Sequence, residues 1–245
     1  MTIVIPMAGE GSRFARTGQL LPKPPIEVDG MPMFIRAARS LPLEYASEII
    51  FPVLKRHIDE FQINDRILNE FQGLPVRVLA LDRCTRGQAE TVRLAINNCS
   101  TTESLVVFNS DSAFEADLHR QLMGLDQNTA GALQYFHSDH PRWSFMRLNA
   151  DGNVIETAEK KVISNYASTG LYYFKSIGDF MVEFDQLEVH AGELYIAPMY
   201  NSMIRKGHRI AALPLGRYFC FGTPEDLTAH MNGKYYTVNS SSVLN

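Results

Sequence analysis

Short apolar runs alternate with longer amphipathic stretches through the first half of the chain, and this alternation constrains the fold more than any other feature. Strands that alternate with helices pack as a mostly parallel sheet with helices on both faces. We therefore predict an α/β fold. The expected buried strands are residues 3–7, 49–54, 76–81, 105–108 and 131–136, and the expected helices are residues 33–40, 57–71, 88–97 and 118–124.

After about residue 140 the pattern changes. Residues 145–148, 153–156 and 170–174 are strand-like, and the common turn pair Asp151-Gly152 separates the first two. This predicts a small antiparallel extension in the C-terminal half. A helix is expected over residues 193–206, and a shorter one after Gly222. We expect one domain over residues 1–235 and a flexible tail over residues 236–245.

Charge and cysteine content exclude several classes of protein. The 23 basic and 27 acidic residues give a net charge of -4, so no general attraction to nucleic acid or to a membrane surface is expected. The three cysteines have neither zinc-site nor disulfide-framework spacing. No segment approaches the length of a membrane span. We expect a cytoplasmic protein with small-molecule partners, and we leave a homodimer open.

The first expected strand runs directly into the turn Met7-Ala8-Gly9-Glu10-Gly11-Ser12-Arg13-Phe14. Ligands of α/β sheets bind at the carboxyl ends of strands, where glycines let backbone amides approach a phosphate. Arg13 could contact a leaving pyrophosphate through two hydrogen bonds. The alternative is an ordinary tight turn with a surface arginine. Pro22-Lys23-Pro24 follows, and its prolines fix the direction of the lysine, which favours a phosphate contact.

The segments Gly9–Phe14, Pro22–Pro24 and Val28–Met33 closely resemble the opening of the NTP-transferase family of sugar-phosphate nucleotidylyltransferases. The resemblance implies a Rossmann-like fold of the GT-A type. It also implies that Arg13 assists the departure of pyrophosphate and that Lys23 stabilises the α-phosphate of an NTP. The residues that it assigns to the NTP phosphates are Ala8, Gly9, Glu10, Gly11 and Ser12.

Two later segments belong to the nucleotide side of the resemblance. Thr85–Val92 resembles the base-recognition stretch of the family, where Gly87 permits a close approach and Gln88 can offer a donor and an acceptor. The same residues also fit a capped helix start, and both interpretations hold together. Asn109-Ser110-Asp111 ends a buried strand. The resemblance places Asn109 beside the nucleotide and makes Asp111 a catalytic ligand of Mg²⁺, whereas the alternative for Asp111 is a turn-capping role.

The remaining matches lie on the side of the acceptor substrate. Arg142 and Trp143 are expected to line it, with the arginine meeting a phosphate; a buried tryptophan with an outward arginine is the alternative. The segments follow the order of the family from residue 3 to about residue 230. By resemblance the other acceptor-binding residues are Glu159, Lys160, Thr169, Gly170 and Glu193.

One position departs from the family. Where sugar-nucleotide enzymes usually carry a second metal-binding aspartate, this chain has Cys220, which is a poor ligand for Mg²⁺. Either one carboxylate holds the metal, or Glu225 or Asp226 substitutes. The segments 140–145 and 222–227 are similar to a subgroup of capsule-biosynthesis cytidylyltransferases, whose members need not use a sugar phosphate.

The resemblance predicts an Mg²⁺-dependent enzyme that transfers a nucleoside monophosphate from an NTP to a small phosphorylated acceptor and releases pyrophosphate. CTP or another pyrimidine NTP is favoured, and the acceptor is a sugar 1-phosphate or another small phosphate. The product would supply surface polysaccharide synthesis. One alternative is a GT-A-type glycosyltransferase, but Asp111-Ser112-Ala113 lacks the second aspartate of an Asp-x-Asp motif. The other is a non-catalytic nucleotide-binding regulator, which the missing aspartate at position 220 suggests.

Overall fold

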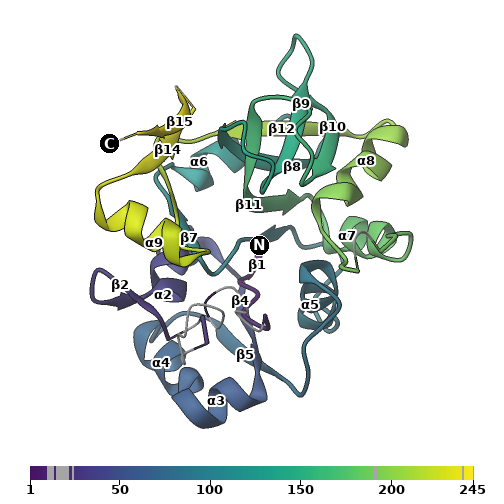
Figure 1. The fold of residues 1–245 in the computed structure, drawn as a ribbon. Helices are drawn as coiled ribbons and strands as arrows, with labels where there is room; N and C mark the ends of the chain where they lie inside the picture. The colour runs from purple at the N-terminus through teal and green to yellow at the C-terminus, as the bar shows by residue number, and fades with distance from the viewer. Residues whose placement is uncertain (10–13, 15–21, 24, 190–191, 239, 245) are drawn as a thin grey trace.

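The computed structural model describes residues 1–9, 14, 22–23, 25–189, 192–238 and 240–244. A large sheet with the strand order β10-β9-β11-β6-β1-β4-β5 runs through its centre (Figure 1). Its parallel part consists of β1 (Thr2–Val4), β4 (Glu48–Leu54), β5 (Val76–Leu81) and β6 (Leu105–Val107). The predicted α/β fold with a mostly parallel central sheet is confirmed.

The rest of the large sheet is mixed. The strand β11 (Tyr166–Phe174) pairs antiparallel with β6 and with β8 (Thr129–His137), and β12 (Arg209–Pro214) then runs parallel to β8. The predicted antiparallel extension consists of β9 (Ser144–Leu148) and β10 (Val154–Glu159), which pair with each other. The sequence analysis did not predict β12.

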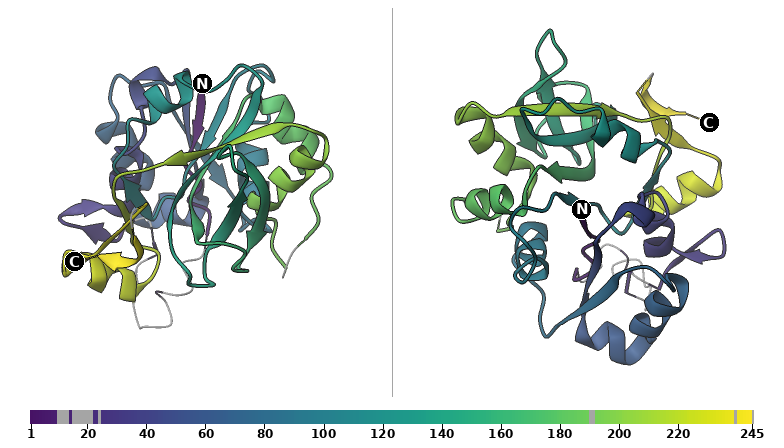
Figure 2. Two further views of the ribbon diagram at one scale, coloured as in Figure 1. Left: turned by 90° about the horizontal axis from the view of Figure 1, so that it is seen from above. Right: turned by 180° about the vertical axis from the view of Figure 1, so that it is seen from behind.

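Side chains alternate between the two faces of the sheet and build a core on each. Ile3 and Ile5 enter one core, whereas Val4 between them enters the other. Figure 2, seen from above, shows purple and blue helices on one side of the strands and green helices on the other. The first core includes α2 (Met33–Ala38), α4 (Ile63–Glu70) and α6 (Leu118–Met123), and the second includes α5 (Gln88–Ala95), α7 (Ile177–Phe184) and α8 (Ala197–Arg205).

Two predicted helices have different bounds in the structure. The helix expected over residues 57–71 is divided into α3 (Lys55–Phe61) and α4, because Gln62 adopts a left-handed conformation with φ of 52°. The helix expected over residues 193–206 begins only at Ala197. Residues 193–195 of the predicted first turn are not helical, since the backbone N–H of Leu194 donates to Arg86 O at 2.8 Å rather than to a helical partner.

A second sheet holds the C-terminal segment. Its order is β15-β14-β13-β7, with β7 (Ser112–Phe114), β13 (Tyr218–Cys220), β14 (Tyr235–Thr237) and β15 (Ser240–Leu244). Within the segment for which we expected a flexible tail, the structure describes residues 236–238 and 240–244, and it places the end of β14 and all of β15 there; the flexibility of this segment stays a prediction. The Tyr236 ring packs against Phe136 and Trp143 at centroid distances of 4.9 and 5.8 Å.

Two small elements complete the fold around the second sheet. The hairpin of β2 (Glu27–Val28) and β3 (Met31–Pro32) precedes α2, and α9 (Pro224–Met231) follows β13. His230 of α9 lies 2.8 Å from the Asp29 carboxylate in that hairpin. Among the described residues, none of the helices has both the length and the apolar character that crossing a bilayer requires.

Cys99 lies beside an ion pair at the amino-terminal edge of the sheet. Arg77 donates to Glu48 at 2.5 Å, and the Cys99 thiol donates to the same carboxylate at 3.2 Å. Burial and the contact with Glu48 raise the pKa of Cys99 from 9.0 to about 11.

This shift predicts slow alkylation of Cys99. The thiolate is the reactive form, so at pH 8 iodoacetamide should modify Cys99 about 100-fold more slowly in the folded protein than in urea. Mass spectrometry of the Cys99 peptide against time measures both rates. Glu48→Gln should speed the reaction in the folded protein, and equal rates in the two states would contradict the assigned environment.

Candidate active site

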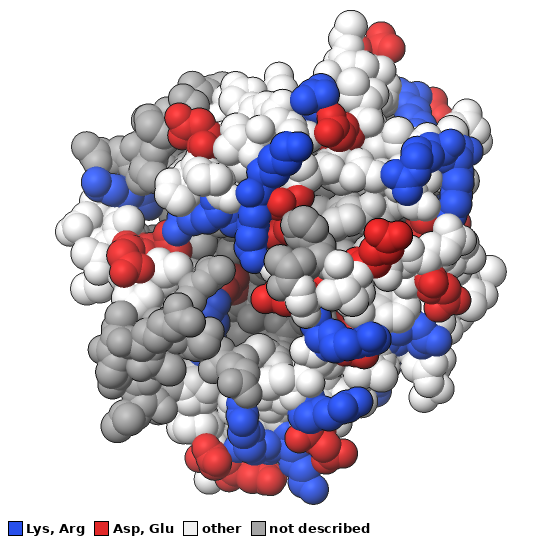
Figure 3. All heavy atoms as spheres, turned by 45° about the vertical axis from the view of Figure 1, so that its right-hand side comes forward, with Lys and Arg blue, Asp and Glu red and all other residues white. Residues whose placement is uncertain are grey.

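A cleft of about 600 Å³ opens at the carboxyl ends of β1, β5 and β6, on the edge of the sheet where ligands of α/β proteins bind. Figure 3 shows the hollowed face with acidic and basic side chains around it. The cleft has walls from both halves of the molecule, because β9, β10 and β11 contribute residues as well.

Every predicted site residue that the structure describes lines this cleft, although the predictions came from segments spread over the whole chain. Glu10, Gly11, Ser12 and Arg13 lie outside the described residues. The individual roles of the lining residues stay predictions. The predicted residues that line the cleft are Ala8, Gly9, Lys23, Gly87, Gln88, Asn109, Asp111, Arg142, Trp143, Glu159, Lys160, Thr169, Gly170 and Glu193.

Lys23 and Asp111 meet in the cleft, with 2.5 Å between the ammonium nitrogen and the carboxylate Oδ2. The side chains are 22% and 20% exposed, so the pair faces the cleft while its stems are packed. The Phe221 N–H donates to Asp111 O at 2.8 Å and joins β7 to β13 there. Gly222 completes the arrangement, since a Cβ at this position would lie 3.2 Å from Asp111 Oδ2.

The donor set around Asp111 fits a magnesium ion that is shared with substrate. Mg²⁺ is commonly held by one or two carboxylates together with phosphate oxygens and water. Asp111 supplies one such carboxylate, and the described residues contain no group of three or more His, Cys, Asp or Glu that could form an all-protein site. Burial, together with the charges of Asp226 and Asp111, raises the pKa of Cys220, so its sulfur stays a neutral thiol and is no ligand for Mg²⁺.

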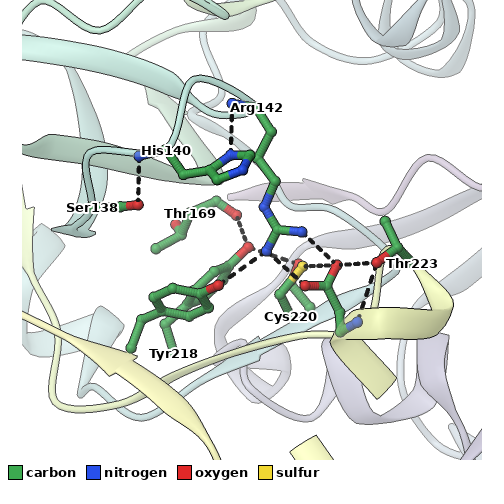
Figure 4. Close-up of polar contacts among 10 residues, drawn as sticks. Ser138, His140, Arg142, Thr169, Tyr218, Cys220 and Thr223 are labelled. Carbon is green, nitrogen blue, oxygen red and sulfur yellow. Dashed lines mark hydrogen bonds and ion pairs between the residues drawn. The ribbon is translucent and has the colours of Figure 1, made fainter. Parts of the chain in front are cut away.

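Asp226 is already bound to Arg142. The guanidinium donates two hydrogen bonds to the carboxylate, at 3.0 and 2.6 Å, and a third to the Tyr236 hydroxyl at 3.1 Å. Figure 4 shows Arg142 reaching toward Cys220 and Thr223, which begins α9. Asp226 is only 7% exposed, and Thr223 donates to its carboxylate at 3.0 Å. This pairing disfavours Asp226 as a substitute ligand, and Glu225, the other candidate, is not among the described residues that line the cleft. A single carboxylate from Asp111 therefore stays the favoured prediction.

Arg142 thus lies at the cleft as predicted, but its charge is balanced by an acid rather than open to an acceptor phosphate. Its guanidinium also lies over the Trp143 ring, 4.0 Å from the centroid. Trp143 is half-buried against Phe136, Tyr218 and Tyr236, and its Nε1 is buried with no hydrogen-bond partner among the described residues. Trp143 therefore packs in an aromatic cluster on β8, β13 and β14 while it lines the cleft, and its role on the acceptor side stays a prediction.

Gly87 joins the loop before α5 to the opposite wall of the cleft. Leu194 N donates to Arg86 O at 2.8 Å, and Ala89 N donates to Leu194 O at 3.0 Å. Between these bonds Gly87 has φ of 143°, and a Cβ there would lie 2.6 Å from both Leu194 N and Leu194 O. Only glycine lets the two backbones approach so closely. The loop before α5, which we predict to contact the nucleobase, and the segment that holds the predicted acceptor-binding Glu193 are therefore joined at this residue.

This contact predicts a large cost for Gly87→Ala. The methyl group would meet backbone that cannot move away, and the φ value is unfavourable for alanine, so unfolding free energy should fall by about 3 kcal/mol. Gly73→Ala is the matched control, because Gly73 has φ of 81° but no atom within 4 Å of its Cβ position. It should cost about 1 kcal/mol. Urea denaturation measures both, and equal costs would refute the steric explanation.

The acceptor side contains a second lysine contact. Lys160 donates to the Tyr195 hydroxyl at 2.5 Å and lies 4.7 Å from the centroid of the same ring. Burial opposes its charge, but Tyr195, Glu159 and Glu193 outweigh that effect and raise the pKa of Lys160. Thr169 is fully buried, and its hydroxyl donates to the Gln134 side chain at 3.2 Å. Tyr195 was not among the predicted site residues; its place two residues after the predicted Glu193, in the segment Gly192-Glu193-Leu194-Tyr195, was the signal that could have identified it.

Comparisons with known proteins show the family of the chain. The sequence profile of the family described as Nucleotidyl transferase matches residues 3–233. The chain is similar to a nucleoside-diphosphate-sugar pyrophosphorylase from Vibrio cholerae RC9, with 29% identity, a TM-score of 0.80, and coverage of 95% of this chain and 100% of that one. An inositol-1-phosphate CTP transferase from T. maritima shares the fold, at 16% identity and a TM-score of 0.76, over 95% of this chain and 93% of that one. A search of curated proteins gives no match.

Proposed function

Because the chain belongs to the nucleotidyl transferase family, we propose that it transfers a nucleoside monophosphate from a pyrimidine NTP, CTP first, to a small phosphorylated acceptor. The acceptor is a sugar 1-phosphate or another small phosphate, and pyrophosphate is the second product. The similarity to the Vibrio cholerae pyrophosphorylase supports a sugar phosphate. We further propose that the reaction takes place in the cytoplasm and supplies an activated precursor for surface polysaccharide.

The observation that carries the proposal is the Lys23–Asp111 pair in the same cleft as the loop of Gly87 and the Lys160–Tyr195 contact. A cation and a metal-binding carboxylate at the carboxyl ends of β1 and β6 suit a polyphosphate. The loop of Gly87 then suits a nucleobase, and the region of the Lys160–Tyr195 contact suits an acceptor. A cleft of about 600 Å³ is within the size range of small-molecule sites.

The chemistry is an in-line displacement at the α-phosphorus. An oxygen of the acceptor phosphate forms the new P–O bond, the bond from the α-phosphorus to the bridging oxygen breaks, and pyrophosphate leaves with that electron pair. The acceptor phosphate is ionised at neutral pH, so no protein nucleophile is needed. Such reactions depend on positioning and charge neutralisation.

Several charged groups of the cleft have a part in this proposal. Lys23 places its ammonium against the α-phosphate, where negative charge must be neutralised as the acceptor approaches. Asp111 would hold Mg²⁺ together with phosphate oxygens, and the ion, when bound, neutralises charge on the polyphosphate. Lys160 and Glu193 orient the acceptor. Arg142, whose charge is balanced by Asp226, keeps Trp143 in place at the same wall.

Pyrophosphate release tests the proposal. Purified protein with Mg²⁺ is assayed with each of CTP, UTP, dTTP, ATP and GTP against sugar 1-phosphates, phosphocholine and phosphoethanolamine. We expect release that requires one NTP together with one acceptor, with a pyrimidine NTP preferred. Mg²⁺-dependent NTP binding without release for any acceptor would instead favour a non-catalytic nucleotide-binding regulator.

A further inference from the structure

A pair of amide side chains connects the nucleotide side of the cleft with its centre. Gln88 is the first residue of α5, and Asn109 lies just beyond the end of β6, two residues before Asp111. Gln88 Nε2 donates to Asn109 Oδ1 at 2.7 Å. Both side chains line the cleft. The contact spans 21 residues of sequence and joins two elements that carry predicted nucleotide ligands.

Gly170 fixes the Asn109 side of this pair. It lies in β11, where the pairing with β8 shifts register between Ser168 and Tyr172, and it has φ of 82°. A Cβ at Gly170 would lie 2.0 Å from Asn109 Nδ2 and 2.5 Å from Asn109 Cγ. The Asn109 amide therefore occupies the volume that any other side chain at position 170 would need. Its position is held by packing as well as by the hydrogen bond.

A side-chain amide can be turned by 180° with little change of shape, which exchanges its donor and its acceptor. In the structure Asn109 turns its oxygen toward Gln88, and in that orientation only the Nε2 end of Gln88 can donate to it. The two amides are thereby coupled, because Gln88 can turn without losing this hydrogen bond only if Asn109 turns with it. In this arrangement Gln88 Oε1 lies at the other end of its amide, where no donor among the described residues meets it, and it offers an acceptor beside the loop of Gly87.

We infer that Asn109, seated against Gly170, is a positioning residue that determines nucleobase selectivity through the orientation of Gln88. This inference rests on the proposed function and deepens it. An oriented acceptor selects a base edge that donates a hydrogen; on a pyrimidine this is the amino group of cytosine or the imino N–H of uracil. The two edges place their donors differently, so a fixed acceptor discriminates between them and an acceptor that can turn into a donor does not.

Calorimetric binding of CTP, UTP, ATP and GTP with Mg²⁺, without acceptor, tests the inference independently of turnover. The quantity compared is the ratio of affinities for the best and the second-best nucleotide. Asn109→Leu keeps the size of the side chain but removes the amide, and should lower this ratio about tenfold. Asn109→Asp still accepts from Gln88, so it should weaken all four nucleotides through charge repulsion and leave the ratio unchanged.

Gly170→Ala provides a second route to the same effect, because its methyl group displaces the Asn109 amide without altering it. It should lower the ratio as Asn109→Leu does. An unchanged ratio in both variants, an equal loss of affinity for every base, or a wild-type protein without base preference would each overturn the inference. Pyrophosphate release by the wild type is scored separately. A selective protein without turnover would refute the proposed function only.

Discussion

Lys23→Ala is expected to lower kcat/KM for nucleotidyl transfer by about 10²–10³-fold, the range found when one preorganised charge-stabilising group is removed from an active site. The ammonium lies 2.5 Å from Asp111, and the Lys23 side chain is 22% exposed at the cleft. The loss should fall mainly on kcat, because the charge matters most when the acceptor phosphate approaches the α-phosphorus. Steady-state pyrophosphate release measures it.

Lys161→Ala is the matched control for this variant. Lys161 is exposed and follows the predicted acceptor-binding Lys160, but it is not among the residues that line the cleft. Its removal should change kcat/KM by less than about twofold, since exposed charges contribute little. If Lys23→Ala had no more effect than Lys161→Ala, the assigned role of Lys23 would be wrong.

The second large effect is expected at Asp226. Asp226→Ala should lower the free energy of unfolding by about 3–5 kcal/mol, because it leaves the Arg142 guanidinium without its carboxylate in a packed environment. The Arg142 and Asp226 side chains are 27% and 8% exposed, and two hydrogen bonds join them. Urea denaturation followed by circular dichroism measures the loss.

A double variant distinguishes the stability lost through an unpaired charge from the stability lost through poorer packing. Arg142→Met combined with Asp226→Leu removes both charges and retains volume, and should be more stable than Asp226→Ala by at least about 2 kcal/mol. If the double variant were as unstable as Asp226→Ala, packing rather than the unpaired charge would explain the loss. A cost below about 1 kcal/mol for Asp226→Ala would show that the pair behaves as a surface ion pair.

Much of the fold could be predicted from the sequence because buried strands leave a local signal. The apolar runs of β1, β4 and β5 enter cores on both faces of the sheet, and their alternation with helices indicated a mostly parallel arrangement. The site could be predicted for a related reason. Its glycines and charged residues occur in short motifs at strand ends, and the confirmed family membership explains why those motifs converge in one cleft.

The structure differs from what the sequence predicts where contacts between distant residues override local conformational preference. No glycine or proline marks the break at Gln62, which depends on how α3 and α4 pack. Arg142 and Asp226 are 84 residues apart in sequence, so no spacing rule could show that the arginine is already paired. The ring of Tyr236 packs in an aromatic cluster built by distant elements, which its own short segment does not indicate. In each case the deciding interaction is tertiary.

The central claim is that the cleft joins a nucleoside monophosphate to the phosphate of an acceptor. Phosphorus-31 NMR of a reaction of NTP, acceptor and Mg²⁺ tests this directly. The account predicts two coupled doublets from a new diphosphate linkage together with the signal of pyrophosphate, and neither in Lys23→Ala on the same time scale. Spectra that show only intact NTP and acceptor across the panel, or only a nucleoside monophosphate from hydrolysis, would contradict it.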